Sequence, residues 1–187
     1  ETNIAGVYAI GDCAQQTEVT GLRRPIEAVW YTGRMMGETL AQTICGNKTA
    51  YKPGHWFNSA KFFEVEYQTY GWVNTDKRKQ EHEQHFHWQH PHEPIAITAA
   101  YHKETNQLLG VNVFGIRLRH AVLDAWLSQH KSLDYCLAHW ADALFDPEFS
   151  NSHQKDLLNH YNTVFQKALK PVKKSWTRIF NPFSTKK

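Results

Sequence analysis

The sequence predicts an α+β fold, in which an antiparallel sheet is followed by C-terminal helices and preceded by one buried strand and one long helix. Three patterns indicate this order. Apolar residues recur at helical spacing over residues 26–45, alternate with polar residues over residues 60–68, and return to helical spacing after residue 119. A polar linker at residues 47–54 separates the first helix from the alternating region, so we place a domain boundary there.

The composition is that of a globular protein. A chain of 187 residues that is 41% hydrophobic and 13% aromatic can bury one good core, which excludes a disordered protein. No apolar run approaches the ~20 residues of a membrane span, and the first residues lack the features of a signal peptide. The cysteines Cys13, Cys45 and Cys136 are widely spaced, so we expect a reducing compartment, the cytoplasm. Because Glu1 precedes a buried strand by only a few residues, we expect the chain to be cut from a longer protein.

The net charge of +3 arises in the C-terminal segment. Residues 157–187 contain seven basic and no acidic side chains, whereas the body has no basic stripe of the kind that nucleic-acid binders need. The tail at residues 167–187 interleaves basic and aromatic residues. It could form an interfacial helix on an anionic membrane or pack its aromatic residues on the body. Pro171 and Pro182 limit the length of any helix there, which favours the packed tail over membrane binding.

The first element is a short apolar run at residues 7–10, which suits a strand buried on both faces. Gly11 ends this strand and allows another group to approach the backbone closely. Asp12 then lies at the carboxyl end of the strand, where open α/β sheets bind ligands, and its carboxylate can accept hydrogen bonds from ligand hydroxyls. A plain turn after a core strand would contain the same residues, so they leave both interpretations open.

A helix is expected next, from about residue 26 to residue 45. Pro25 suits its first turn, where the missing N–H group costs nothing. Gly33 and Gly37 are four residues apart, so the helix could pack closely against a sheet or a ligand, and simple close packing is the favoured interpretation. One face of the helix would collect Ile26, Val29, Trp30, Gly33, Met36, Gly37, Leu40 and Ile44.

In the second half of the chain, apolar and polar residues first alternate as in strands and then follow helical spacing. Residues 60–68 predict a half-buried strand that residues 70–74 continue after a turn. The short polar turn at residues 103–107 indicates that the strands on either side of it form an antiparallel hairpin. The hairpin strands are expected at residues 95–102 and 108–114, and helices at about residues 119–129, at about residues 133–144 and from residue 152 to Pro171.

The segment at residues 82–92 is rich in histidine. If it is extended, His85 and His87 point to one side, as metal-chelating pairs do. A zinc site needs three or four ligands in a rigid frame, and this segment has no cysteine near it. The favoured interpretation is therefore a polar hairpin or loop, with histidines that titrate near neutral pH.

Four stretches resemble one family. Residues 7–14, Val-Tyr-Ala-Ile-Gly-Asp-Cys-Ala, resemble the second flavin-binding motif of the FAD-dependent pyridine-nucleotide oxidoreductases, which have two dinucleotide-binding domains. Residues 23–38 are similar to the same segment in the ferredoxin reductase and apoptosis-inducing factor branch. Residues 56–59 and 109–113 resemble parts of the C-terminal domain of that branch.

The resemblance implies six cofactor-binding residues. Asp12 would hold the ribityl or pyrophosphate region of FAD, and Gly11, with Cys13 beside it, would let the cofactor pass close to the backbone. Contacts with the flavin ring would come from Pro25, Ile26 and Glu27, mostly through the backbone. The N-terminus of the following helix would stabilise negative charge on a reduced flavin.

The resemblance also implies the domain organisation and the function. Residues 1–47 would be the terminal strand and helix of an FAD-binding domain, residues 48–166 a C-terminal α+β interface domain, and residues 167–187 a basic tail. NAD(P)H would be the co-substrate, and a second copy or a redox protein would be the partner. Because the sequence has no Gly-x-Gly-x-x-Gly turn, we expect this piece alone to be inactive, and we assign no catalytic or metal-binding residue.

Two alternatives remain open at this stage. The chain could be a stand-alone interaction module without flavin, whose tryptophans form a partner face. It could also be an independent protein in which the Gly11-Asp12 motif is due to chance.

Overall fold

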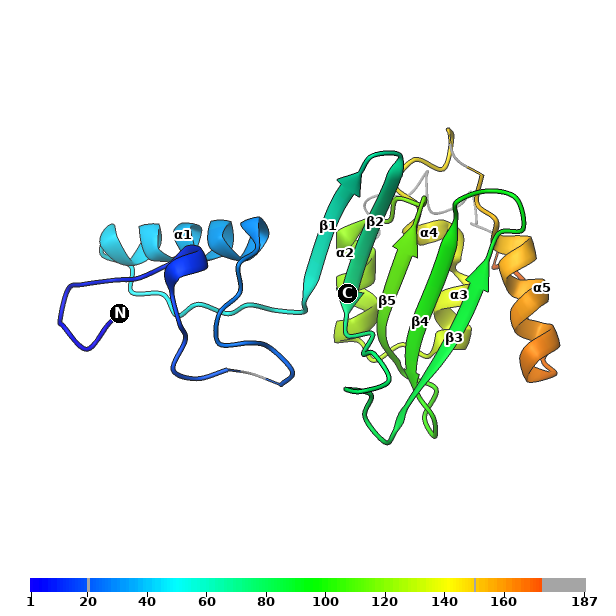
Figure 1. The fold of residues 1–187 in the computed structure, drawn as a ribbon, viewed down its shortest axis with the longest axis horizontal. Helices are drawn as coiled ribbons and strands as arrows, with labels where there is room; N and C mark the ends of the chain where they lie inside the picture. The colour runs from blue at the N-terminus through cyan, green and yellow to red at the C-terminus, as the bar shows by residue number, and fades with distance from the viewer. Residues whose placement is uncertain (20, 150, 173–187) are drawn as a thin grey trace, which may run out of the picture.

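In the computed structural model, residues 1–19, 21–149 and 151–172 are described, and they form two parts (Figure 1). The N-terminal part contains a 3₁₀ turn, η1 (Gly11–Cys13), and one long helix, α1 (Trp30–Ile44). An extended linker leads from it to a five-stranded antiparallel sheet with helices, which confirms the predicted α+β class. None of the helices in these described ranges is long and apolar enough to cross a membrane.

All strand pairs in the sheet are antiparallel, and the strand order is β1-β2-β5-β4-β3. The predicted hairpin is confirmed, because β4 and β5 pair along their length across the turn at residues 103–107. The bounds are β1 (Phe57–Phe62), β2 (Val65–Gly71), β3 (Glu83–Gln89), β4 (Ala96–His102) and β5 (Leu108–Phe114).

One prediction for the sheet is wrong, and one is confirmed in part. Residues 60–68 are not one strand, because Phe62 pairs with Val65 and a two-residue turn at Phe63 and Glu64 divides them. Phe63 has a φ of +52°, a conformation for which such turns normally use Gly or Asn, so the sequence carried no turn signal. The histidine-rich segment, predicted as a polar hairpin or loop, is the edge strand β3 and forms a hairpin with β4. It is not polar throughout, because Phe86 and Trp88 alternate into the core.

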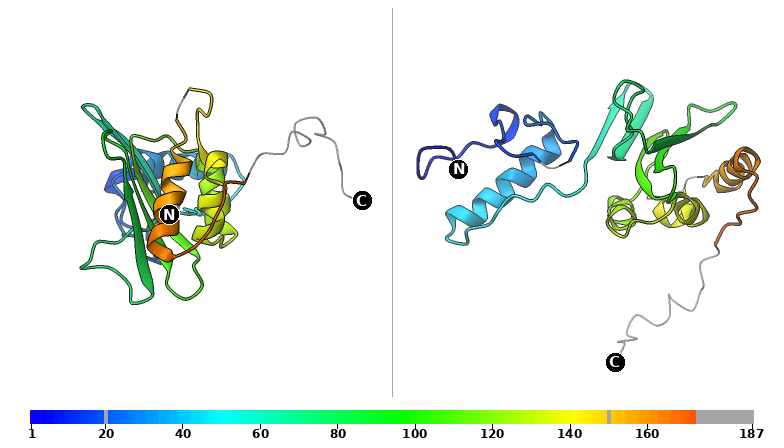
Figure 2. Two further views of the ribbon diagram at one scale, coloured as in Figure 1. Left: turned by 90° about the vertical axis from the view of Figure 1, so that its right-hand side faces the viewer. Right: turned by 90° about the horizontal axis from the view of Figure 1, so that it is seen from below.

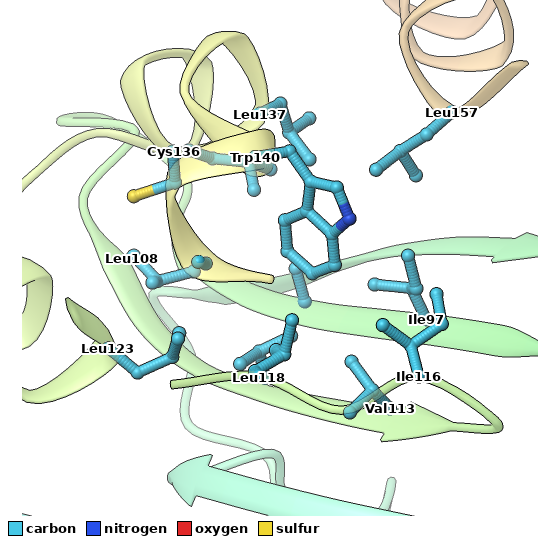
Figure 3. Close-up of a cluster of buried hydrophobic side chains, with 14 of the residues drawn as sticks. Ile97, Leu108, Val113, Ile116, Leu118, Leu123, Cys136, Leu137, Trp140 and Leu157 are labelled. Atoms are coloured by element: carbon cyan, nitrogen blue, oxygen red, sulfur yellow. The ribbon is translucent and has the colours of Figure 1, made fainter. Parts of the chain in front are cut away.

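The helices lie on one face of the sheet (Figure 2). The helix expected at about residues 133–144 is instead two helices, divided at His139. His139 Nδ1 lies 2.9 Å from the Tyr135 carbonyl oxygen, and the His139 ring stacks on the Tyr135 ring. Figure 3 shows the core between sheet and helices, with the Trp140 indole at its centre. The helices are α2 (His120–Ser128), α3 (Leu133–Ala138), α4 (Trp140–Ala143) and α5 (Gln154–Phe165).

The N-terminal part departs from its predictions in two places. Residues 7–10 form no strand, because every strand of the described ranges lies between residues 57 and 114 and none pairs with them. Helix α1 begins at Trp30 and not near residue 26, so Pro25 lies in the preceding loop and not in the first turn. The exposed fraction of Trp30 is 68% and that of Ile44 is 71%, so part of the predicted apolar face is not covered by the residues that the structure describes.

The start of the basic tail packs on the body, whereas its larger part, residues 173–187, lies outside the described residues. The Lys167 ammonium donates to both Asp134 carboxylate oxygens at 2.7 Å, and the Tyr161 hydroxyl donates to the same carboxylate. Burial raises the pKa of Asp134, but these hydrogen bonds outweigh it and hold the pKa below its ordinary value. The Asp134 carboxylate therefore ties the end of α5 to α3.

We expect Asp134→Asn to lower the free energy of unfolding by about 1–2 kcal/mol at neutral pH, because two donors lose a charged acceptor. Because the pKa of Asp134 is lower in the folded protein, the carboxylate stabilises the fold fully above its unfolded-state pKa, about 3.9. This stabilisation is lost as the pH falls through the folded-state pKa. Denaturant unfolding at several pH values measures this, with Glu104→Gln in an exposed turn as the control. A stability difference that persists unchanged to the lowest pH would contradict the account.

Candidate functional site

The turn η1 packs directly against α1. A Cβ atom added at Gly33 would lie 3.6 Å from the Gly11 Cα atom, and one at Gly37 would lie 3.9 Å from Ile10 Cδ1. The Gly11 N–H group also points to the Met36 sulfur at 3.3 Å. The two helical glycines therefore do allow close packing, but the partner is the chain's own turn and not a sheet.

This packing brings three of the predicted cofactor residues beside α1. Gly11 has a φ of +76°, and its Cβ position faces open space, so another molecule can approach the backbone there. Asp12 and Cys13 are exposed. Within the described part of the chain, no donor contacts the Asp12 carboxylate, and the Cys13 thiol points to the Ile10 carbonyl oxygen at 3.6 Å. The turn thus presents a free acceptor to solvent.

The loop before α1 is fixed by a buried ion pair. Arg23 Nη1 donates to the two Glu27 carboxylate oxygens at 2.7 and 2.6 Å, and the two side chains are 6% and 2% exposed. Arg23 Nη2 donates to the carbonyl oxygens of Pro53 and Gly54 at 3.0 and 3.2 Å. The guanidinium also lies 5.7 Å from the centre of the Trp56 ring. We call this set of contacts the Arg23 clamp; it leaves no free oxygen on Glu27 for a cofactor.

The other two predicted residues in this loop are exposed. The Pro25 carbonyl oxygen accepts a hydrogen bond from the Gln16 N–H at 2.8 Å, which links this loop to the segment after η1. Ile26 presents its apolar side chain to solvent. The Thr32 hydroxyl bonds the Glu27 carbonyl oxygen at 3.1 Å, and this contact holds the loop against the first turn of α1.

Sequence reasoning missed a pocket of about 450 Å³ between this loop and the sheet domain. We call it the two-tryptophan pocket. The rings of Trp56 and Trp72 are stacked there, with centres 5.6 Å apart and planes 14° from parallel. Because its residues come from distant segments, only the fold reveals it; the pocket is also lined by Arg24, Asn74, Arg78 and Asn112.

A second pocket, of about 390 Å³, lies where Tyr31 of α1 meets β1. The Tyr31 hydroxyl is 2.9 Å from the Ser59 hydroxyl, and the His120 ring lies 4.2 Å from the Phe57 ring. Burial raises the pKa of Tyr70, which also lines this pocket, to about 12, so its phenol stays neutral and is no base near pH 7.

The histidines of β3 are held by protein groups. His85 Nε2 lies 2.6 Å from a Glu83 carboxylate oxygen, and His87 Nδ1 lies 2.9 Å from the Thr98 hydroxyl. Burial raises the pKa of Glu83, but hydrogen bonds from Asn74, His85 and Gln80 more than offset it, so the pKa lies below its ordinary value. In residues 1–19, 21–149 and 151–172 no group of three or more His, Cys, Asp or Glu side chains is arranged to hold a metal ion.

Comparisons with known proteins show similarity at the level of the fold. No protein-family model and no curated protein matches the sequence. The structure is similar to an NAD-dependent persulfide reductase from A. fulgidus, with 16% identity, a TM-score of 0.56, and coverage of 84% of this chain and 32% of that one. A FAD-dependent pyridine nucleotide-disulphide oxidoreductase from Desulfovibrio vulgaris gives 13% identity, a TM-score of 0.49 and coverage of 72% and 34%. The chain therefore spans about a third of the length of these enzymes, and it shares its fold with part of the persulfide reductase.

Proposed function

We propose that this chain provides part of the flavin site of an FAD-dependent NAD(P)H oxidoreductase. Residues 1–47 are then the end of the flavin-binding domain, residues 48–166 the C-terminal domain and residues 167–187 a basic tail. The observation that carries the proposal is the exposed Asp12 carboxylate, which has no donor in the described residues and sits on a turn packed against α1. The fold shared with the persulfide reductase supports it.

The residues of the turn fit one region of FAD. A carboxylate accepts hydrogen bonds from hydroxyl groups and repels phosphate, so Asp12 suits the ribityl chain better than the pyrophosphate. Gly11 leaves the backbone open to approach, and Cys13 adjoins it on the same exposed turn. Bound FAD supplies the hydride-transfer chemistry, and these residues bind and orient it.

The loop before α1 contributes to the flavin ring. Pro25 and Ile26 offer exposed apolar surface, and Glu27 acts through its backbone because its carboxylate belongs to the Arg23 clamp. The positive end of the α1 dipole lies at Trp30, three residues after Glu27, and stabilises negative charge on a reduced flavin. The adenylate end of FAD has no phosphate-binding turn in this sequence.

A specific observation also favours the alternative function of an interaction module. Aromatic side chains gather at the β1–β2 turn, where Phe63 is 96% exposed and the Phe62 and Tyr67 rings stack. Phe114 of β5 continues this group beside Tyr67. Trp88, Trp126 and Trp140 cannot form the partner face, because they are buried. In the flavoenzyme, the same aromatic group serves a second copy of the chain or a redox protein in the cytoplasm.

The Asp12 assignment predicts a large loss of flavin affinity in the full-length gene product that contains this sequence. Hydrogen bonds to a charged group contribute about 1.5–3 kcal/mol, so Asp12→Asn and Asp12→Ala should raise the FAD dissociation constant by about 10- to 150-fold. Quenching of flavin fluorescence measures the constant, and Glu18→Gln, at another exposed carboxylate, is the matched control. An unchanged constant in both Asp12 variants would remove this residue from the site.

The packing of η1 on α1 gives an independent test. Gly33→Ala places a methyl group in ordinary contact with Gly11 and should keep the flavin affinity. Gly33→Leu leaves no room for η1 and should weaken FAD binding by about tenfold or more, because the turn is displaced from the helix. Similar affinity in the two variants, with α1 still helical by circular dichroism, would show that the turn does not contact the cofactor.

A further inference from the structure

We propose that the two-tryptophan pocket binds a phosphorylated aromatic ring, the mononucleotide unit of a nucleotide or of a flavin. The inference does not rest on the proposed flavin contacts, because Gly11, Asp12, Cys13 and residues 25–27 do not line this pocket. It rests on the combination of stacked indoles, free arginines and amide groups around a hollow of about 450 Å³.

The aromatic part of the ligand is indicated by the two indoles. Trp56 and Trp72 stack on each other and are only half-buried, although tryptophan has a large apolar side chain. Aromatic side chains that remain accessible in a pocket bind planar rings by stacking, and every base or flavin ring has a π-face for this contact. The other tryptophans of the sheet domain are instead buried in its core.

The anionic part of the ligand is indicated by the two arginines. Arg24 and Arg78 are exposed and line the pocket from two segments. In the described residues neither guanidinium has a hydrogen-bond or ion-pair partner, whereas Arg23, Arg34 and Arg117 each pair with a carboxylate. A guanidinium presents a planar fork of donors that matches phosphate oxygens. Two unpaired guanidinium groups beside stacked indoles therefore favour a ligand in which a phosphate is attached to an aromatic ring.

Amide groups complete the wall of the pocket. The Thr69 hydroxyl donates to Asn112 Oδ1 at 2.6 Å, so the Asn112 Nδ2 group remains a donor. Asn74 donates through Nδ2 to Glu83 at 2.7 Å, so its Oδ1 remains an acceptor. A donor on β5 and an acceptor in the loop after β2 suit the polar edge of a heterocyclic base.

The loop that carries Arg78 is anchored by a buried carboxylate. Glu83 is 2% exposed and accepts hydrogen bonds from the Asn74 N–H at 3.0 Å and from the Gln80 N–H at 3.4 Å. These contacts close the loop between β2 and β3 at both ends. Arg78 is therefore presented to the pocket by a fixed loop.

Titration calorimetry on the 187-residue chain tests the proposal with four probes: AMP, FMN, adenosine and inorganic phosphate. We expect AMP, FMN or both to bind at least tenfold more tightly than adenosine or phosphate alone, because only the mononucleotides engage the indoles and the arginines together. AMP binding without FMN binding identifies an adenine nucleotide as the source, and the reverse identifies the flavin. Binding of neither AMP nor FMN would overturn the proposal.

Two variants and one control locate the site. Arg78→Gln and Trp72→Leu should each weaken mononucleotide binding about tenfold, whereas Arg117→Gln, which alters an arginine outside the pocket, should not. Loss of FMN affinity in Asp12→Asn but not in Arg78→Gln would place FMN at the flavin contacts and not in this pocket. If circular dichroism shows that the Trp72→Leu variant is unfolded, the affinity of Arg78→Gln alone decides whether the pocket is the binding site. Equal affinities in Arg78→Gln and Arg117→Gln would show that binding occurs elsewhere.

Discussion

The arrangement of the chain depends on one buried guanidinium. An arginine removed from water is stable only when its charge and donors are satisfied, and the Arg23 clamp meets this need with Glu27, two linker carbonyl groups and the Trp56 ring. These contacts join the loop before α1, the linker and the start of the sheet domain. They also place Arg24 at the two-tryptophan pocket and the loop residues at the proposed flavin site.

The two parts that the clamp joins differ in how they are stabilised. The sheet domain has a continuous core between its strands and helices, centred on Trp140 (Figure 3). The N-terminal part buries little, and Val7, Ile10, Trp30 and Ile44 remain exposed. Under the proposed function these side chains are contacts with other parts of the flavin-binding domain. The same feature explains why the residues predicted to bind the cofactor lie on an open turn.

The sequence predicted the elements whose signals are local. The β4–β5 hairpin and helix α2 follow from alternation, a polar turn and helical spacing, and the structure confirms them. The missing strand partner of residues 7–10 could not be predicted, because strand pairing depends on distant segments. The turn at Phe63 could not be predicted either, because it lacks the Gly or Asn that such turns normally use. Of the site, the motif residues could be named, but the Arg23 clamp and the two-tryptophan pocket arise from the meeting of distant segments.

The most direct test of the Arg23 clamp is a double-mutant cycle of Arg23→Met and Glu27→Gln, read by hydrogen exchange of the α1 amides. Each single change leaves an uncompensated buried group, so each should lower the opening free energy of α1. The double variant should lose less than the sum of the two, with a coupling energy of about 1–3 kcal/mol. Additive effects, within about 0.5 kcal/mol, would show that the ion pair does not organise this part of the molecule.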